Sequence, residues 1–305
     1  MFLRIRCSSL VVVPDDAHVG ERLFPHPSSE ARVRIPHRVV VALLSACAIG
    51  CVDATEPVEV DSTLGILGGT PTGMSYGAVG ALLLDYNKDG VIDADDEWCS
   101  GTLIAPTLFL TAAHCVAPDP DQPLGSQFYV SFAPDLSAST ATMIAAVRYD
   151  WDPRYGASQA NLHDLAIVTL PAGAAQGITP ARLPRAGALE PLARRGVSFV
   201  NVGYGASAVG KGGSFFTYDG VRRMSLSPFM SLQPTWLSLS MNTKATGLGG
   251  DCYGDSGGPK FRDGDATTIY ATVSTGDAVC RATSQSWRLD TPEARGFLGT
   301  FVALP

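Results

Sequence analysis

Apolar residues occur along the chain in short, often alternating runs, each bounded by Gly, Pro or Asp. The clearest runs cover residues 78–84, 102–110, 127–132, 165–170, 197–202, 236–241 and 269–274. Short runs with turn residues between them are typical of many short β-strands. The pattern therefore predicts an all-β fold, either a sandwich or barrels. The stretch 203–220 is rich in Gly and Ser, and we expect it to form a mobile surface loop.

One segment, close to the C-terminal end, has a helical pattern. Asp290 or Thr291 can cap its N-terminus, Pro292 fits the first helical position, and Glu293 favours the first turn. An apolar face follows. Its members are Phe297, Leu298, Phe301 and Val302.

The first 65 residues have the composition of a targeting segment. Basic residues at 32–38 precede an apolar run at 39–46, which is the order found in bacterial export signals. The run ends in Leu-Ser-Ala-Cys at residues 44–47, similar to the lipobox in which a cysteine carries the lipid. We interpret residues 1–47 as an export signal with Cys47 lipidated or, alternatively, as a plain secretory signal. Residues 1–31 are interpreted as the product of a misplaced start codon, and the acidic residues 48–65 as a tether or propeptide.

Composition narrows the possible functions of the 305-residue chain. A hydrophobic fraction of 46% supplies enough apolar material for a core in residues 66–305. The formal net charge of −7 provides no general attraction to nucleic acid or to an anionic membrane surface. No apolar stretch reaches the length of about 18 residues that a membrane span requires. We therefore exclude nucleic-acid binding and expect membrane contact only through a lipid anchor, in a secreted or cell-envelope protein.

Four of the seven cysteines lie in residues 66–305, namely Cys99, Cys115, Cys252 and Cys280. An even number in an exported domain favours disulfides. Proximity in sequence predicts the pairs Cys99–Cys115 and Cys252–Cys280. A metal site is the alternative, but no Cys-x-x-Cys spacing supports it.

The segment 254–259, Gly-Asp-Ser-Gly-Gly-Pro, has the pattern of an exposed nucleophile. Its glycines permit a tight turn that presents the hydroxyl of Ser256 beside free backbone N–H groups. Gly-x-Ser-x-Gly also occurs in α/β-hydrolases, where the catalytic histidine follows the serine. Residues 66–305 contain only His114 and His163, and both precede Ser256. The order His, Asp, Ser excludes the α/β-hydrolase reading.

Three segments together resemble the catalytic motifs of trypsin-like (chymotrypsin-family) serine proteases. They are residues 110–115 around His114, residues 163–168 around Asp164 and residues 254–259 around Ser256, while Ile-Leu-Gly-Gly at 66–69 resembles the mature N-terminus. The resemblance implies two antiparallel six-stranded β-barrels, at about 66–183 and 184–305, with a short C-terminal helix. It also implies a monomer that acts on protein or peptide substrates, and the two disulfides match bridges of this family.

The resemblance assigns a role to each motif residue. His114 is the general base, Asp164 orients it, and Ser256 attacks the peptide carbonyl to form an acyl-enzyme, with no cofactor. The backbone N–H groups of Gly254 and Ser256 form the oxyanion hole. We expect His163 to lie on a strand and to point away from Asp164. Two alternatives stay open, a catalytically silent binding protein with this fold and an esterase-like hydrolase.

Activation in this family depends on a new N-terminus, whose ammonium pairs with the aspartate beside the nucleophile. The corresponding pair is Ile66 and Asp255. The residue before the cut is Gly65 rather than a basic residue, so we expect a separate activating protease that does not cut as trypsin does.

The specificity pocket matches the family less closely. Gly250 stands where trypsin-like members that cleave after Arg or Lys have Asp, and Asp251 follows it. Ser274, Thr275 and Gly276 match the strand that pairs with the substrate backbone. Asp251 either attracts a basic P1 side chain or faces away, in which case a small or apolar P1 residue is expected.

Residues 85–96 match the opening of an EF-hand-type loop, D-x-[DN]-x-[DN]-G. Oxygen ligands at alternate positions, with Gly90 at the sharp turn, are typical of a Ca²⁺ site. Mutual repulsion among the loop's carboxylates also favours a cation. We predict a structural calcium ion, with an acidic solvated hairpin as the alternative. The predicted ligands are Asp85, Asn87, Asp89, Val91, Asp93 and Asp96.

Overall fold

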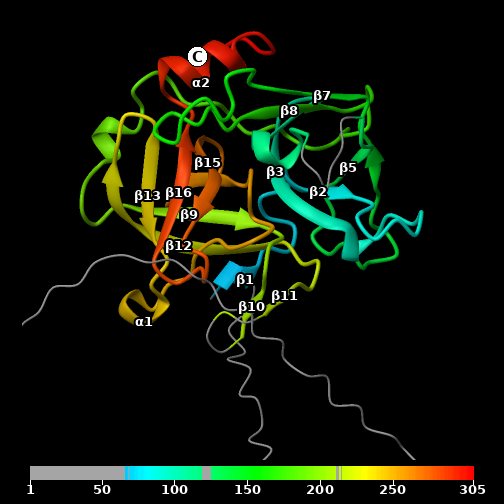
Figure 1. The fold of residues 1–305 in the computed structure, drawn as a ribbon, viewed down its shortest axis with the longest axis horizontal. Coiled ribbons are helices and arrows are strands. Elements are labelled where there is room, and N and C mark those ends of the chain that lie inside the picture. The colour runs from blue at the N-terminus through cyan, green and yellow to red at the C-terminus, as the bar shows by residue number, and fades with distance from the viewer. Residues whose placement is uncertain (1–65, 68, 119–124, 211–212, 214) are drawn as a thin grey trace, which may run out of the picture. The chain divides into compact units, whose positions relative to one another are not determined.

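A computed structural model describes residues 66–305, apart from 68, 119–124, 211–212 and 214 (Figure 1). The predicted export signal, Cys47 and the acidic segment 48–65 lie outside the described residues. Within the described part, no helix is both long enough and apolar enough to cross a membrane.

The first half forms one antiparallel sheet, which we call the N-terminal sheet. Its strand order is β6-β5-β2-β3-β4-β8-β7. The predicted strand 102–110 is two strands, because the chain turns at residues 106–107 between β3 and β4. The strands are β2 (Val79–Leu84), β3 (Glu97–Ala105), β4 (Leu108–Thr111), β5 (Phe128–Ser131), β6 (Ile144–Ala145), β7 (Arg148–Trp151) and β8 (Ala166–Thr169).

The second half forms a closed six-stranded antiparallel barrel, which we call the C-terminal barrel. The barrel closes because β12 pairs with β9 on one side and with β13 on the other. A further short strand, β1 (Thr70–Pro71), pairs with β12. The barrel strands are β9 (Ser198–Gly203), β12 (Arg223–Leu232), β13 (Trp236–Ser240), β14 (Pro259–Arg262), β15 (Ile269–Gly276) and β16 (Thr283–Arg288).

These sheets confirm the predicted antiparallel all-β class, with one difference in detail. The C-terminal barrel closes with six strands, whereas the N-terminal sheet is curled and open. Its end strand β6 is two residues long and pairs only with β5, so the ladder is not completed.

The pattern of apolar runs does not predict several of the barrel strands, because many of their buried side chains are polar. In β12, Arg223, Ser225 and Ser227 are buried while the residues between them are less so. In β16 the buried positions include Ser284 and Ser286. Part of the barrel interior is therefore a polar network rather than an apolar core.

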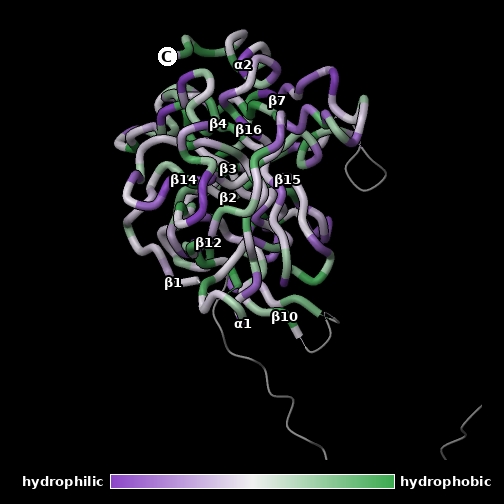
Figure 2. The backbone as a smooth tube through the Cα atoms, turned by 90° about the vertical axis from the view of Figure 1, so that its left-hand side faces the viewer, coloured by the Kyte–Doolittle hydropathy of each residue, from purple (hydrophilic) through white to green (hydrophobic). Residues whose placement is uncertain are grey.

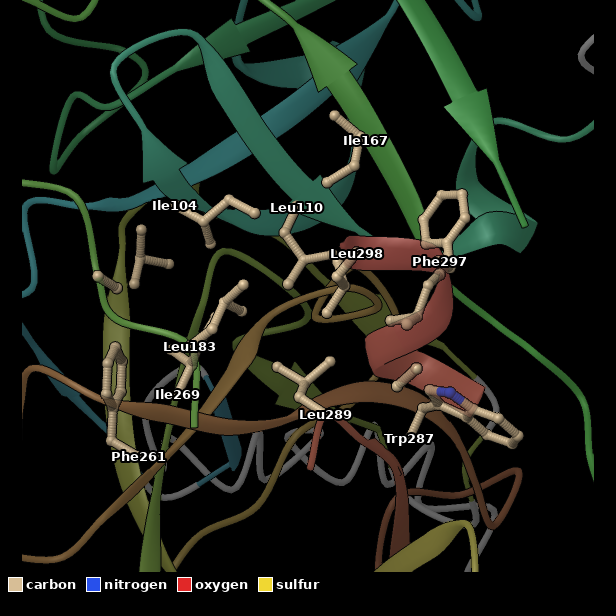
Figure 3. Close-up of a cluster of buried hydrophobic side chains, with 14 of the residues drawn as sticks. Ile104, Leu110, Ile167, Leu183, Phe261, Ile269, Trp287, Leu289, Phe297 and Leu298 are labelled. Atoms are coloured by element: carbon tan, nitrogen blue, oxygen red, sulfur yellow. The ribbon is translucent and has the colours of Figure 1, made fainter. Parts of the chain in front are cut away.

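The main apolar cluster joins both halves and the C-terminal helix (Figure 3). Ile104 and Leu110 of the N-terminal sheet contribute to the same cluster as Phe261 and Trp287 of the barrel. Apolar positions recur along the strands of both halves (Figure 2). This shared core fixes the loops of the two halves against each other.

The predicted helix is α2 (Pro292–Leu298). Thr291 is its N-cap and accepts a hydrogen bond from the N–H of Ala294, whereas Asp290 instead binds Arg288. The predicted apolar face is only partly helical. Phe301 lies in a turn after the helix, although it still packs against the main cluster.

The predicted surface loop 203–220 contains a small hairpin. Strands β10 (Ala208–Val209) and β11 (Phe216–Thr217) pair with each other. Tyr204 and Ala206 are completely buried, so the start of this segment belongs to the interior.

Both predicted disulfides are confirmed. Cys99 and Cys115 are bonded with a Cα–Cα distance of 6.3 Å, and Cys252 and Cys280 with 5.3 Å. The first joins β3 to the segment carrying His114. The second braces the segment that precedes Ser256.

Candidate active site

His114 and Asp164 meet at the ends of neighbouring strands. His114 lies in a short 3₁₀ turn (Ala113–Cys115) directly after β4, and Asp164 lies just before β8, which pairs with β4. The Nδ1 of His114 is 2.8 Å from Oδ2 of Asp164, and the backbone N–H of His114 donates to Oδ1 at 2.9 Å. Ser274 on β15 donates its hydroxyl to the same Oδ2. The carboxylate thus holds His114 by two bonds, one to the imidazole and one to the backbone N–H.

The surroundings raise the pKa of His114 and lower that of Asp164, as expected for a histidine and an aspartate that interact. Burial lowers the pKa of His114, but the charge and hydrogen bond of Asp164 outweigh it and leave the pKa raised. Burial raises the pKa of Asp164, but the charge of His114 and the hydrogen bonds from His114 and Ser274 leave it lowered. Asp164 is completely buried, whereas the His114 side chain is 31% exposed. The imidazole is therefore accessible and its partner is not.

His163 does not lie on a strand, contrary to the prediction. It precedes β8 and has a left-handed backbone conformation, with φ of 56°. Its Nδ1 is 3.5 Å from the carboxylate of Asp152, and its ring packs on Trp287. His163 is buried between Asp152 and Trp287, away from Ser256. We therefore assign it a structural role and not a catalytic one.

Ser256 lies in a turn that depends on two glycines with positive φ. Gly254 has φ of 89° and Gly257 has φ of 78°. A Cβ on Gly257 would lie 2.1 Å from the hydroxyl of Thr111, so no larger residue fits. The backbone N–H groups of Gly254 and Ser256 donate to no acceptor among the described residues. Both remain available to bind an oxyanion.

His114 and Ser256 line the same pocket, which has a volume of about 280 Å³. The pocket continues along β15, where the predicted substrate-strand residues Ser274, Thr275 and Gly276 also line it. The structure thus brings the predicted base, nucleophile and substrate strand to one site.

Asp255 is buried behind the nucleophile. Its carboxylate accepts hydrogen bonds from the N–H groups of Gly205 at 3.0 Å and Cys252 at 2.8 Å. Ile66 is also buried, 1% exposed. The adjacent Leu67 accepts a hydrogen bond from the N–H of Gly250, so the start of the domain lies beside the pocket wall. No ion pair joins Ile66 and Asp255 in the described, uncut chain.

Burial and the nearby charge of Asp251 raise the pKa of Asp255 to about 7, against an ordinary value of 3.8. A carboxyl whose pKa rises on folding stabilises the fold while protonated, so its contribution is lost between about pH 4 and about pH 7. We expect the melting temperature of uncut Ser256→Ala protein to fall across this interval. Adding Asp255→Asn should make the fall smaller, as measured by calorimetry, and equal slopes would contradict the assignment.

Glu97 is a site residue that the sequence motifs missed. Both of its carboxylate oxygens are buried and have no hydrogen-bond partner among the described residues. A Cβ built on Gly254 would lie 2.7 Å from Glu97 Oε2, so this carboxylate packs directly against that glycine. Burial and the charge of Asp255 raise its pKa well above the ordinary value. Only the fold could reveal it, because 157 residues separate Glu97 from Gly254.

Asp251 lies in the pocket wall, 3% exposed, with both oxygens bonded. Oδ1 accepts from the ammonium of Lys260, and Oδ2 accepts from the hydroxyl of Ser284 at 2.8 Å. Gly250 packs closely on Met241, whose Cγ would lie 2.6 Å from an added Cβ. Met241 lines the pocket as well, and Gly250 itself does not.

The predicted calcium loop has the local geometry of its motif. Asp85 accepts from the N–H of Gly90 at 3.1 Å, and Asp89 from the N–H of Val91 at 2.8 Å. One buried oxygen of Asp85 and one of Asp96 have no hydrogen-bond partner among the described residues.

The side chains of this loop are nevertheless not gathered as in a closed metal site. Among the His, Cys, Asp and Glu side chains of the described residues, the only set of three ligand atoms within 4.8 Å of one another is on Cys99, His114 and Cys115. The two sulfurs of that set form a disulfide, so the set is not a metal site.

The closed barrel, the curled sheet and the His–Asp pair beside a turn-borne serine define a protease-like class of protein. A family model described as trypsin matches residues 84–286. More than half of the chain is matched, so the chain belongs to the trypsin family.

Solved structures confirm the fold. A structure titled HBP has a TM-score of 0.58 and 17% identity, covering 78% of this chain and 97% of the other. HL collagenase has a TM-score of 0.56 and 18% identity, covering 77% and 98%. A mutant of human heparin binding protein (CAP37) has a TM-score of 0.58 and 18% identity, covering 78% and 99%. At such identity the likeness concerns the fold alone.

Proposed function

We propose that this protein is a serine endopeptidase that cleaves protein or peptide substrates through an acyl-enzyme. The observation that carries the proposal is the hydrogen bond between His114 and the buried Asp164, with His114 lining the same pocket as Ser256. A binding protein with this fold would have no need of an accessible imidazole held by a buried carboxylate.

Each chemical step uses a group already described. His114 takes the proton from the Ser256 hydroxyl as the oxygen attacks the substrate carbonyl, and then gives it to the leaving amine. Asp164 keeps the proton on Nδ1, so that Nε2 is the accepting nitrogen, and it stabilises the imidazolium. The N–H groups of Gly254 and Ser256 stabilise the oxyanion, an effect of about 3 kcal/mol per donor in comparable sites. Water then attacks the acyl carbonyl while His114 takes its proton, and His114 returns that proton to the Ser256 oxygen as the ester bond breaks and the acid product leaves.

Peptide hydrolysis by a chain beginning at Ile66 tests this proposal. The fold is shared with a heparin binding protein and with a collagenase, so the fold does not decide between binding and catalysis. We expect turnover of both peptide amides and the matching esters. Turnover of esters alone would favour the esterase-like alternative, and turnover of neither would favour the binding protein.

We further propose that cleavage between residues 65 and 66 activates the enzyme. A new Ile66 ammonium would form an ion pair with the buried Asp255, which has none among the described residues, and would order the adjacent turn. The same cut would free the domain from a lipid anchor at Cys47. We expect the chain beginning at Ile66 to hydrolyse peptides at least about tenfold faster than one beginning at Ala48, the gain of a single favourable charge pair. Equal rates would contradict activation by cleavage.

The loop at residues 85–96 is proposed to bind a structural Ca²⁺. Asp85, Asn87, Asp89, Asp93 and Asp96 would supply side-chain oxygens and Val91 its carbonyl, and the ion would offset their mutual repulsion. At about 100 times its Kd, Ca²⁺ should add about 2.7 kcal/mol and raise the melting temperature by roughly 5 °C or more.

The control for this calcium effect is a matched pair of variants. Asp89→Ala should abolish the increase, whereas Asp263→Asn, at an exposed carboxylate outside the loop, should retain it. A melting temperature that responds to neither Ca²⁺ nor chelator would contradict the site.

A further inference from the structure

Asp251 is a buried carboxylate in the wall of the specificity pocket, and the buried ammonium of Lys260 forms an ion pair with it. Lys260 on β14 is 0% exposed, and its ammonium donates to Oδ1 of Asp251 and to Oδ1 of Asn201, the latter at 2.6 Å. Asp251 lines the pocket that also contains Ser256. The charge of this carboxylate is therefore already paired from inside the barrel.

The pair is held by a polar network that spans the barrel interior. Asn201 donates its amide to the hydroxyls of Ser225 at 2.9 Å and Ser227 at 2.7 Å. Ser227 in turn donates to the carbonyl of Gly249, in the segment that leads to Asp251. Because buried polar groups of this kind are costly to leave unpaired, the network fixes the ammonium in place.

A basic P1 side chain would bring a second cation to Asp251. The carboxylate then faces two positive charges in a site removed from water, which leaves one uncompensated. An uncharged side chain leaves the neutral pair intact. It also finds apolar contact on the side chain of Met241, which is buried at the pocket wall.

Among the described residues, the pocket is lined by one other carboxylate, that of Asp277. Its two oxygens accept hydrogen bonds from the backbone N–H groups of Arg281, Ala282 and Thr283, at 2.8 to 2.9 Å. These bonds turn the carboxylate toward its own loop. Asp251 is therefore the carboxylate that a deeply bound P1 group would meet.

We propose that Lys260 is a specificity-determining residue and that the enzyme cleaves after uncharged, apolar P1 residues rather than after Arg or Lys. This inference rests on the proposed peptidase activity. Lys260 acts through Asp251 and does not itself touch the substrate.

Peptide substrates that differ only at P1 test the inference. For the chain beginning at Ile66, we expect kcat/KM with Leu or Met at P1 to exceed that with Arg or Lys by at least about tenfold, the difference made by one unfavourable charge. Lys260→Met frees the charge of Asp251 and should reverse the order. The double variant Lys260→Met/Asp251→Asn restores a neutral pair and should again prefer Leu or Met.

The double variant also controls for a folding defect, because Lys260→Met alone leaves the buried carboxylate of Asp251 without a counter-charge. If Lys260→Met does not fold, the inference is judged from the P1 preference, measured as kcat/KM, of the wild type and of the double variant. A wild type that prefers Arg or Lys overturns the inference, as does a folded Lys260→Met protein with an unchanged order.

Binding of benzamidine, an aromatic cation of P1 size, gives a readout independent of turnover. Calorimetry should show at least about tenfold tighter binding to Lys260→Met than to the wild type. If peptides are not cleaved at all, the proposed function fails, but this affinity difference still tests the charge of the pocket. Equal affinities would contradict the role of Lys260.

Discussion

Ser256→Ala is expected to reduce kcat/KM for peptide hydrolysis by about 10⁴- to 10⁶-fold, since the nucleophile and its base act as a unit. The fold should be retained. The backbone bonds of the turn, from Ser100 N–H to Ser256 O and from Gly257 N–H to Val273 O, do not involve the hydroxyl. Steady-state kinetics with a fluorogenic peptide measures the loss.

The matched control for the nucleophile is Ser238→Ala in β13. Ser238 is buried, and its hydroxyl donates to Gln285 in the barrel, outside the pocket. We expect kcat/KM to change by less than about threefold there, because only a local hydrogen bond is lost. Ser256→Ala protein that retained more than about a hundredth of the wild-type rate would contradict the assigned nucleophile.

Asp164→Asn is expected to lower kcat/KM by about 10⁴-fold through the wrong imidazole tautomer. The carboxylate accepts three bonds, two from His114 and one from Ser274. An amide that accepts the backbone N–H of His114 must turn its NH₂ group toward Nδ1. Nδ1 then becomes the acceptor, Nε2 carries the proton, and the base can no longer accept one from Ser256.

The pH profile separates this explanation from a loss of folding. The charge of Asp164 raises the pKa of His114, and the neutral imidazole is the active base, so the activity of the wild type rises as His114 deprotonates. In Asp164→Asn, which lacks that charge, the low-pH limb of the pH–activity profile should move to lower pH. Asp152→Asn, at the aspartate beside His163, is the control and should leave the limb in place. An unmoved limb in Asp164→Asn would contradict the pairing.

The sequence predicted those parts of the molecule that short segments specify. The two disulfides and the N-cap of α2 depend on residue types close in sequence, and the structure confirms both predictions. The motif residues His114 and Ser256 line one pocket, as the resemblance implied. Their functional roles stay predictions.

The parts that the sequence did not reveal depend on distant contacts. Strand β12 buries Ser225 and Ser227 toward Asn201, so the more buried positions of its alternating pattern are polar, opposite to what the pattern predicts. The pairing of Lys260 with Asp251 requires β14 to lie next to the pocket wall, which no local pattern specifies. The apolar run that begins at Leu165 predicts a strand near His163, yet the strand starts only at Ala166.

The most direct test of the central claim is covalent labelling with a fluorophosphonate, read by intact-protein and peptide mass spectrometry. A folded chain beginning at Ile66 should gain one adduct, located on Ser256, and its Ser256→Ala variant should gain none. This result requires an activated serine beside a working base and oxyanion site. A folded chain that gains no adduct, or gains it on another residue, would contradict the assignment of Ser256, His114 and Asp164 as the catalytic site.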